Sequence, residues 1–294
     1  MTGRLDGRTA IVTGASRGLG RAIALALAAE GAAVAVVART EQVWNDKLPG
    51  TIGETVAEIE AAGGRAVAIR ADLTDRDDIV GLVDEARAAL GPITVLVNNA
   101  AFTAPGRPPV PGAQAPIKKA AKASVPQADW PAFVGTPVHA FRRHFEIAVF
   151  AAYELMQLVV PDMLAAGHGA IVNISSVASR IPGAGPFSDF AGGILAGYGG
   201  SKAALEHLTE SAAYELQRRN ISVNALSPSQ AMMTPGLSYY RNDCRDFGEV
   251  GAMTDFAEAV VRLALVDPNA VTGRTIGHRE VLDGTFTEFR GGRA

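Results

Sequence analysis

The chain has 294 residues, of which 27 are basic and 30 acidic, giving a formal net charge of −3. At this length a folded chain buries roughly 75% of the surface that its unfolded form exposes, so a stable core needs no crosslinks. The balanced charge, without a long basic run, argues against a protein that holds nucleic acid by its phosphates. The single cysteine, Cys244, and the scattered histidines lack metal-site spacing. They predict a metal-free protein of a reducing compartment, the cytoplasm.

The N-terminal residues carry no long apolar stretch before the first glycines, so we expect no secretory leader. The most membrane-like stretch, residues 22–38, is interrupted by Glu30 and Gly31. It falls short of the roughly 20 apolar residues that a bilayer span requires. We therefore expect a helix followed by a strand at this point, and a protein without a membrane partner.

Short apolar runs rich in β-branched residues alternate with helical patterns along the chain. The runs are continuously apolar, which is typical of parallel strands covered on both faces. Seven strands are expected, at residues 9–13, 34–38, 66–70, 93–97, 170–174, 221–225 and about 275–282, the last after a helical pattern at 256–265. The sequence thus predicts one α/β domain over residues 1–294, with a mostly or fully parallel, doubly wound sheet.

Two segments interrupt this alternation. Residues 102–138 contain eight prolines around a basic cluster, Lys118, Lys119 and Lys122. Proline at this density forbids a regular helix or a central strand, so we expect an excursion from the sheet that is functional or partly disordered. Residues 230–253 carry several methionines and aromatic side chains. They are expected to form either a lid over a small ligand or a docked surface loop.

A glycine-rich turn follows the first expected strand, where open parallel sheets bind their ligands. The turn spans residues 13–20 and places Gly14, Gly18 and Gly20 in the spacing GxxxGxG before a helix. Glycines let the backbone N–H groups approach a pyrophosphate, which the helix N-terminus also favours. The alternative is a turn with a purely structural role.

Arg39 follows the second expected strand, where an enzyme that uses NAD usually has an acidic residue. A guanidinium there suits a 2′-phosphate, and Arg17 can approach the same group from the other side. This pattern favours NADP(H) over NAD(H), with two solvated arginines as the alternative.

Asp72 and Leu73 follow the third strand, where the carboxylate can accept from an adenine amino group. Helix capping by Asp72 or Thr74 is the other interpretation.

Polar residues also follow the fourth and fifth expected strands. Residues 98–100 read Asn-Asn-Ala, and their amides can tie neighbouring strand ends together. Ser176 follows the fifth strand, and Tyr198 and Lys202, four residues apart, share one helix face. A phenol titrates near pH 10 in water, so proton exchange at neutral pH calls for a neighbouring cation, which Lys202 can supply. In isolation, a Tyr and a Lys at this spacing more often have a structural role than a catalytic one.

Together, in this order and at these strand ends, the motifs resemble those of the short-chain dehydrogenase/reductase family, which has a Rossmann fold. The resemblance covers about residues 7–284, and residues 47–52 are similar to the hydroxysteroid-dehydrogenase-like branch. It implies that Tyr198 is the general acid/base, that Lys202 lowers the pKa of Tyr198 and holds the nicotinamide ribose, and that Ser176 polarises the substrate carbonyl. The cofactor-binding residues implied by the motifs and the resemblance are Gly14, Ser16, Arg17, Gly18, Leu19, Gly20, Arg39, Asp72, Leu73, Asn99, Ala100, Tyr198, Lys202 and Pro228.

The chain departs from the family pattern at four points. Ala148 stands where the family usually has an asparagine that helps to hold a proton-relay water, and Ala101 and Ser229 replace glycines. Ser176 and Tyr198 are 22 residues apart, which is more than the usual gap. A longer loop can still bring the two hydroxyls together.

The expected function is therefore an NADP(H)-dependent oxidoreductase that interconverts an alcohol and a ketone or aldehyde. The apolar content of residues 230–253 favours a small hydrophobic substrate, although the cluster at residues 118–122 could meet an anionic tail. The resemblance implies a homodimer or homotetramer. The rival hypothesis is a dinucleotide-binding protein without turnover, suggested by Ala148 and the long loop between Ser176 and Tyr198. A third hypothesis is an enzyme whose residues 102–138 recruit a partner protein.

Overall fold

The computed structural model describes residues 3–102, 136–180, 195–240 and 250–287. Their central feature is a sheet with the strand order β3-β2-β1-β4-β5-β6-β9, in which each neighbouring pair is parallel. The strands are β1 (Thr9–Thr13), β2 (Ala33–Ala38), β3 (Arg65–Arg70), β4 (Val95–Asn98), β5 (Gly169–Ile174), β6 (Ile221–Ser227) and β9 (Thr275–Gly277). The predicted doubly wound parallel sheet is confirmed, and the bounds of the first six strands agree with the prediction to within two residues.

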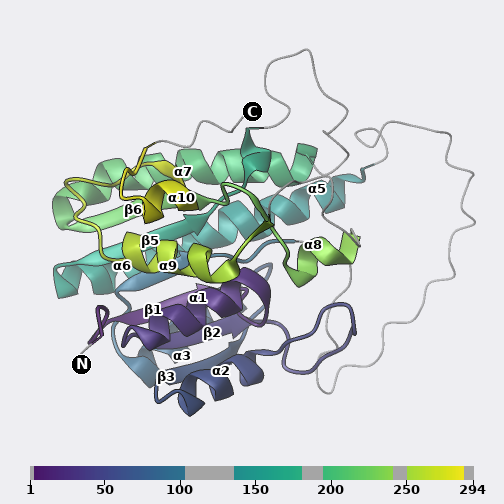
Figure 1. The fold of residues 1–294 in the computed structure, drawn as a ribbon, viewed down its shortest axis with the longest axis horizontal. Coiled ribbons are helices and arrows are strands. Elements are labelled where there is room, and N and C mark those ends of the chain that lie inside the picture. Colours follow the sequence, from purple (N-terminus) through teal and green to yellow (C-terminus); the bar gives the residue numbers. More distant parts are fainter. Residues whose placement is uncertain (1–2, 103–135, 181–194, 241–249, 288–294) are drawn as a thin grey trace, which may run out of the picture.

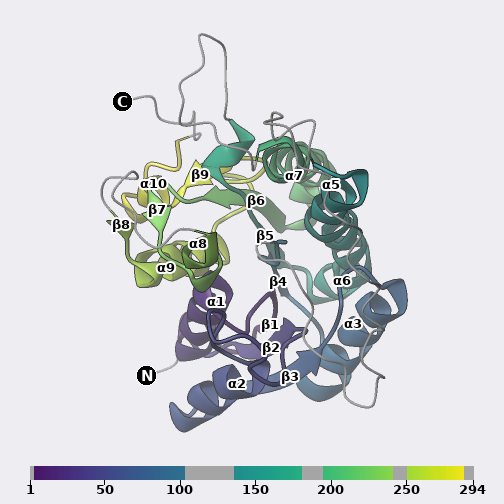
Figure 2. The same ribbon diagram turned by 90° about the vertical axis from the view of Figure 1, so that its right-hand side faces the viewer.

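Helices cover both faces of the sheet (Figures 1 and 2). One face is covered by α1 (Gly18–Ala29), α2 (Ile52–Ala61) and α9 (Met253–Leu263). The other is covered by α3 (Arg76–Leu90), α6 (Ala151–Ala166) and α7 (Gly200–Leu216). Residues 22–38 form the end of α1 and the strand β2, as the sequence predicts.

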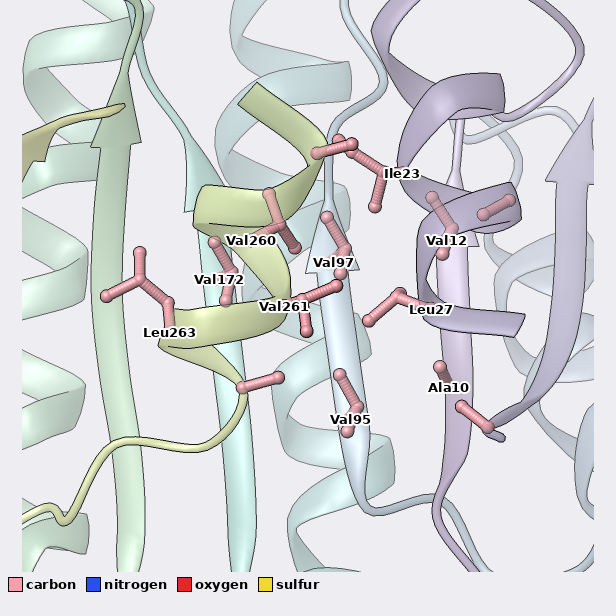
Figure 3. Packing of buried hydrophobic residues seen from close by; sticks show 14 of the residues in the cluster. Ala10, Val12, Ile23, Leu27, Val95, Val97, Val172, Val260, Val261 and Leu263 are labelled. Carbon is pink, nitrogen blue, oxygen red and sulfur yellow. The ribbon is translucent and has the colours of Figure 1, made fainter. Parts of the chain in front are cut away.

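The core consists of two apolar layers, one on each face of the sheet. Figure 3 shows the first layer, in which Val95 and Val97 of β4 pack near Val260 and Val261 of α9. Leu96, between the two valines, belongs to the layer on the opposite face. Burying a side chain of this size contributes roughly 1.5–3 kcal/mol, so continuous apolar strands stabilise both layers at once.

The last predicted strand is wrong in its second half. The strand β9 ends at Gly277, and His278–Leu282 forms a short helix, α10. His278 and Val281 are both buried. Because they are three residues apart, a helical turn places both on one face, whereas a strand would point them to opposite faces.

Helix α5 (Val138–Phe145), a π-helical turn η1 (Glu146–Phe150) and α6 form one continuous helical stretch. By length and composition this stretch could cross a membrane, but 44% of its most apolar part is buried inside the fold. The buried side chains of α6, among them Leu155 and Val159, belong to the core layer against the sheet. This arrangement is typical of a core helix.

The two irregular segments are only partly described. Most of the proline-rich excursion, residues 103–135, lies outside the described residues, and its last residue, Val138, already begins α5. In the segment 230–253, the structure has β7 (Ala231–Met232), α8 (Pro235–Tyr240) and β8 (Val250–Gly251), with residues 241–249 outside the described part. Strands β7 and β8 pair in parallel, so the described parts of this segment contain regular structure.

Candidate active site

A cleft of about 280 Å³ lies beyond the carboxyl ends of the strands. Every residue that the sequence predicted for catalysis or cofactor binding lines it. They are Gly14, Ser16, Arg17, Gly18, Leu19, Gly20, Arg39, Asp72, Leu73, Asn99, Ala100, Ser176, Tyr198, Lys202 and Pro228. The parallel sheet brings them together because it places the carboxyl ends of its central strands at one edge.

The glycine turn is closed so tightly that side chains do not fit. A Cβ on Gly14, which has φ +69°, would lie 2.9 Å from the Asn99 amide nitrogen. A Cβ on Gly20 would lie 2.3 Å from the carbonyl oxygen of Gly14. Helix α1 begins at Gly18, and Arg17 makes no side-chain cap. Backbone N–H groups at such an uncapped helix start fit an anionic pyrophosphate.

The amides after β4 connect the strand ends, as predicted. The Asn99 side-chain nitrogen donates to the Thr13 carbonyl at 2.8 Å, and the Ala100 N–H donates to Thr13 Oγ1 at 3.1 Å. Asn98 donates to the side chain of Asn173 on β5 at 2.9 Å. These bonds hold the end of β4 against the ends of β1 and β5.

Arg17 and Arg39 converge at one end of the cleft. Arg17 Nη2 donates to Thr40 Oγ1 at 3.0 Å and to the Gly50 carbonyl at 3.1 Å. Its Nε is buried without a hydrogen-bond partner among the described residues. Burial, together with the nearby charge of Arg39, lowers the pKa of Arg17. Neither arginine is freely solvated, and two half-buried guanidinium groups at this position fit a phosphate.

Asp72 lies beside Arg39, with 3.7 Å between Asp72 Oδ2 and Arg39 Nη1. Its other oxygen accepts from the backbone N–H of Thr74 at 3.1 Å and from the Thr74 hydroxyl at 2.8 Å. The N-cap of α3 is Asp75, which accepts from the Asp77 N–H. The capping alternative for Asp72 and Thr74 is therefore wrong.

Ser176, Tyr198 and Lys202 meet in spite of the 22-residue gap. Tyr198 lies in a π-helical turn, η3 (Leu195–Gly199), which leads directly into α7. Lys202 Nζ lies 5.8 Å from the centroid of the Tyr198 ring and donates to the Ile174 carbonyl at 2.6 Å. Ser176 is the N-cap of the short 3₁₀ helix η2 (Val177–Ser179) and a hydrogen-bonding neighbour of Tyr198.

Burial governs the electrostatics of this group. It lowers the pKa of Lys202 to about 8, and the charge of Glu206 opposes that shift. It raises the pKa of Tyr198, with the Ser176 hydrogen bond acting in the opposite direction. The shift of Tyr198 is thus opposite to the lowering that the family resemblance implied, because desolvation of a phenolate is the larger effect. The phenol is protonated at neutral pH and can act as an acid.

His144 of α5 contacts the site, and the sequence analysis missed it. Its ring lies edge-on to Tyr198, with 6.0 Å between centroids, and 5.3 Å from the ring of Phe102. Its Nδ1 is buried without a hydrogen-bond partner in the described parts of the chain. Burial lowers the pKa of His144, and the charge of Lys202 lowers it further. No local pattern around His144 signals this contact, because it depends on how α5 packs against η3.

Other lining residues were also missed by the search for motifs. They come mainly from the loop after β2, from η1 and from the start of α8, and are Thr40, Trp44, Leu48, Phe102, Ile147, Thr234, Pro235 and Gly236. A Cβ on Gly18 would lie 3.3 Å from Thr234 Cβ, so the segment before α8 packs on the glycine turn.

In the described residues, no group of three or more His, Cys, Asp or Glu side chains could hold a metal ion.

The departures from the family pattern have distinct surroundings. Ala148 is buried in η1 and carries no polar group toward the site. Ala101 lines the cleft. The Ser229 hydroxyl donates to Glu280 Oε2 at 3.0 Å, and its N–H donates to His278 Nδ1 at 2.9 Å. Ser229 is therefore tied to α10.

A parallel, doubly wound sheet with a tight glycine turn at the start of α1 defines a dinucleotide-binding protein of the Rossmann type. The family model described as short chain dehydrogenase matches residues 8–244. The chain belongs to the short-chain dehydrogenase family and is an oxidoreductase, so the resemblance read from the motifs is confirmed.

Relatives lie near the hydroxysteroid dehydrogenase branch. The chain is 31% identical to the 7alpha-hydroxysteroid dehydrogenase of Escherichia coli strain K12 over 280 residues, which cover 93% of each chain. A structure of a 7 alpha-hydroxysteroid dehydrogenase with NADH and 7-oxo glycochenodeoxycholic acid matches with a TM-score of 0.70 and 30% identity, covering 93% of each chain. A structure from Beutenbergia cavernae, described as an NAD(P)-dependent gluconate 5-dehydrogenase with bound NADP, matches with a TM-score of 0.72 and 29% identity. The match covers 95% of this chain and 98% of that chain.

Proposed function

We propose that the protein is an NADP(H)-dependent oxidoreductase that interconverts an alcohol and a ketone or aldehyde. The observation that carries this proposal is the meeting of Ser176, Tyr198 and Lys202 in the same cleft as the glycine turn. One hydroxyl, one phenol and one buried ammonium can together bind a carbonyl oxygen, supply its proton and stabilise the phenolate that remains.

The residues have separate roles in this mechanism. When bound, the nicotinamide supplies hydride to the carbonyl carbon or accepts it from the alcohol. Ser176 donates a hydrogen bond to the substrate oxygen, and Tyr198 gives that oxygen its proton during reduction and takes it back during oxidation. Lys202 stabilises the phenolate that remains and binds the ribose. The raised pKa of Tyr198 in the free protein means that its proton is in place before the substrate arrives.

The cofactor preference is supported by the two arginines. Arg17 and Arg39 lie within each other's electrostatic influence at the end of the cleft, and an anion between them relieves their repulsion. Asp72, on the other side of Arg39, would accept from the adenine. We therefore propose that the adenosine 2′-phosphate of NADP(H) binds between Arg17 and Arg39. The relatives are described with both NADH and NADP.

A hydrophobic carbonyl compound or alcohol is the proposed substrate class. Phe102 and Ile147 give the catalytic end of the cleft apolar walls, and the segment before α8 borders it. Large, rigid apolar substrates fit such a wall, and a relative is described with an oxidised bile acid. The cluster Lys118, Lys119 and Lys122 lies outside the described residues, and its contact with an anionic substrate tail stays a prediction.

Exposed aromatic side chains support the proposed homodimer or homotetramer. Phe150 at the start of the α6 stretch is 64% exposed, and Tyr214 on α7 is 87% exposed. Aromatic side chains are enriched in the surfaces that oligomers bury, so we propose that these two rings lie in subunit interfaces. Light scattering should give a mass that is a multiple of 30.5 kDa.

The test is a screen of purified protein with NADPH and NADH against ketones, aldehydes, quinones and steroids, followed by Tyr198→Phe. This variant keeps the ring and removes only the proton donor. It should bind the cofactor as the unmodified protein does, while turnover falls at least about 10²-fold. Turnover at the unmodified rate would contradict the mechanism.

The second candidate function is dinucleotide binding without turnover. It is favoured by Ala148, because η1 then has no asparagine amide to hold a proton-relay water. In that case NADPH would bind with the same preference, but no compound of the panel would be reduced or oxidised. The same screen therefore separates the two functions.

A further inference from the structure

We propose that Glu206 is a positioning residue for the reaction, because its buried carboxylate holds the segment that carries Ser176 against the helix that carries Lys202. The inference rests on the proposed function for the roles of Ser176 and Lys202. It concerns a residue that neither the motifs nor the family resemblance singled out.

Glu206 is 4% exposed and lies one helical turn after Lys202 on α7. Its Oε1 accepts from the Ser175 hydroxyl at 2.5 Å and from the Ser179 hydroxyl at 2.6 Å. Its Oε2 lies 3.0 Å from Arg180 Nη2. The carboxylate thus binds residues on both sides of Ser176 in the chain.

Burying a carboxylate is costly unless hydrogen bonds and an opposite charge compensate it. Here two hydroxyls and a guanidinium do so, and all three belong to residues 175–180, which contain Ser176. The Ser179 hydroxyl also lies 2.8 Å from the Ser176 carbonyl oxygen. The backbone of Ser176 is therefore held while its own hydroxyl remains directed toward Tyr198.

The same carboxylate acts on Lys202. The groups around the Lys202 ammonium are the Ile174 carbonyl at the end of β5, the Tyr198 ring on η3 and His144 on α5. Glu206 is the neighbour whose negative charge counteracts the effect of burial on the pKa of Lys202, and Arg180, which follows η2, compensates part of that charge. Removing the charge of Glu206 should make Lys202 lose its proton at a lower pH.

The experiment compares Glu206→Gln with Glu210→Gln in the full-length protein. Glutamine keeps the shape and one acceptor oxygen but removes the charge, and Glu210 is an exposed residue one turn further along α7. We expect Glu206→Gln to lower kcat about tenfold or more with nearly unchanged NADPH affinity. We also expect the pH at which activity is lost on the alkaline side to fall. Glu210→Gln should change neither quantity.

A second readout does not depend on turnover. The chain has five lysines, so ¹³Cε-labelled lysine should give a resolvable Lys202 signal, assigned by its loss in Lys202→Met. Its titration midpoint should lie near 8 in the unmodified protein and clearly lower in Glu206→Gln. This measurement tests the inference even if the screen finds no substrate, in which case the proposed function alone fails.

Ser175→Ala and Ser179→Ala provide a check in case Glu206→Gln does not fold. Each removes one hydrogen bond to Glu206 without changing its charge, and together they should lower kcat while leaving the Lys202 midpoint in place. Unmodified kcat in this double variant would overturn the proposal. Unmodified kcat in Glu206→Gln together with an unmoved Lys202 midpoint would also overturn it, since Glu206 would then neither hold the Ser176 segment nor act on Lys202.

Discussion

Lys202 Nζ donates to the carbonyl oxygen of Ile174 at 2.6 Å, which fastens the start of α7 to the end of β5. The carbonyl is neutral, so it compensates only part of the cost of burying an ammonium that is 1% exposed. The lowered pKa of Lys202 follows from this arrangement. The bond also orients the ammonium beside the Tyr198 ring.

Replacing Lys202 with Met should increase stability at pH 7 while it impairs function. The folded protein binds this proton less tightly than the unfolded chain does, because the pKa falls from 10.5 to about 8. A lowered lysine pKa costs stability at all pH values below 8, and this cost is relieved as the pH rises toward 10.5. We expect Lys202→Met to raise the free energy of unfolding by roughly 1–3 kcal/mol at pH 7.

Denaturant titrations at pH 7 and pH 10 would measure this effect, and the gain should shrink at the higher pH. Cofactor affinity and turnover should fall together in the same variant, because the ammonium serves both the ribose and the phenolate. Equal stability of both proteins at pH 7 would show that the lysine is buried without penalty.

Arg39→Asp should reverse or erase the preference for NADPH. A carboxylate repels the 2′-phosphate and accepts from a free 2′-hydroxyl, so the Kd for NADPH should rise about tenfold or more, which corresponds to about 1.4 kcal/mol. Calorimetry with both cofactors measures the change. Arg21→Gln is a suitable control, because Arg21 pairs with Glu58 on the surface. Tighter binding of NADH by the unmodified protein would contradict the assignment.

Gly20→Ala should damage the cofactor site although it adds a single methyl group. Its Cβ would meet the Gly14 carbonyl at 2.3 Å, so the glycine turn or α1 must shift. We expect at least about a tenfold loss of NADPH affinity, together with lower thermal stability. Gly81→Ala is the matched control. Gly81 lies inside α3 with no atom near the position of an added Cβ, so this change should stabilise the protein by roughly 0.5–1 kcal/mol.

His144 should titrate below the ordinary histidine pKa of 6.5, because it is partly buried and close to the charge of Lys202. Removing that charge in Lys202→Met should raise the pKa of His144 toward its ordinary value. Proton NMR of the histidine rings measures both effects, with His144→Ala used for assignment. An unchanged His144 midpoint in Lys202→Met would show that the two groups are not coupled.

Much of the fold was predictable because its determinants are local. Continuous apolar runs such as residues 9–13 and 170–174 have the pattern of strands covered on both faces, whatever their partners. The prediction failed at His278–Leu282, where a short apolar run suits both a strand and a helical turn, and burial of His278 and Val281 on one face decides between them.

The sequence by itself determined which residues follow each strand end as candidates for the site. They are the glycine turn, the paired asparagines, Ser176, and Tyr198 with Lys202. It did so because a tight turn requires glycine and because four residues separate neighbours on a helix face. Only the tertiary structure decided that Ser176 meets Tyr198 across 22 residues, that His144 and Glu206 contact the site, and that the pKa of Tyr198 rises. Burial and electrostatic interactions depend on groups that are distant in the chain, so no local pattern of residues records them.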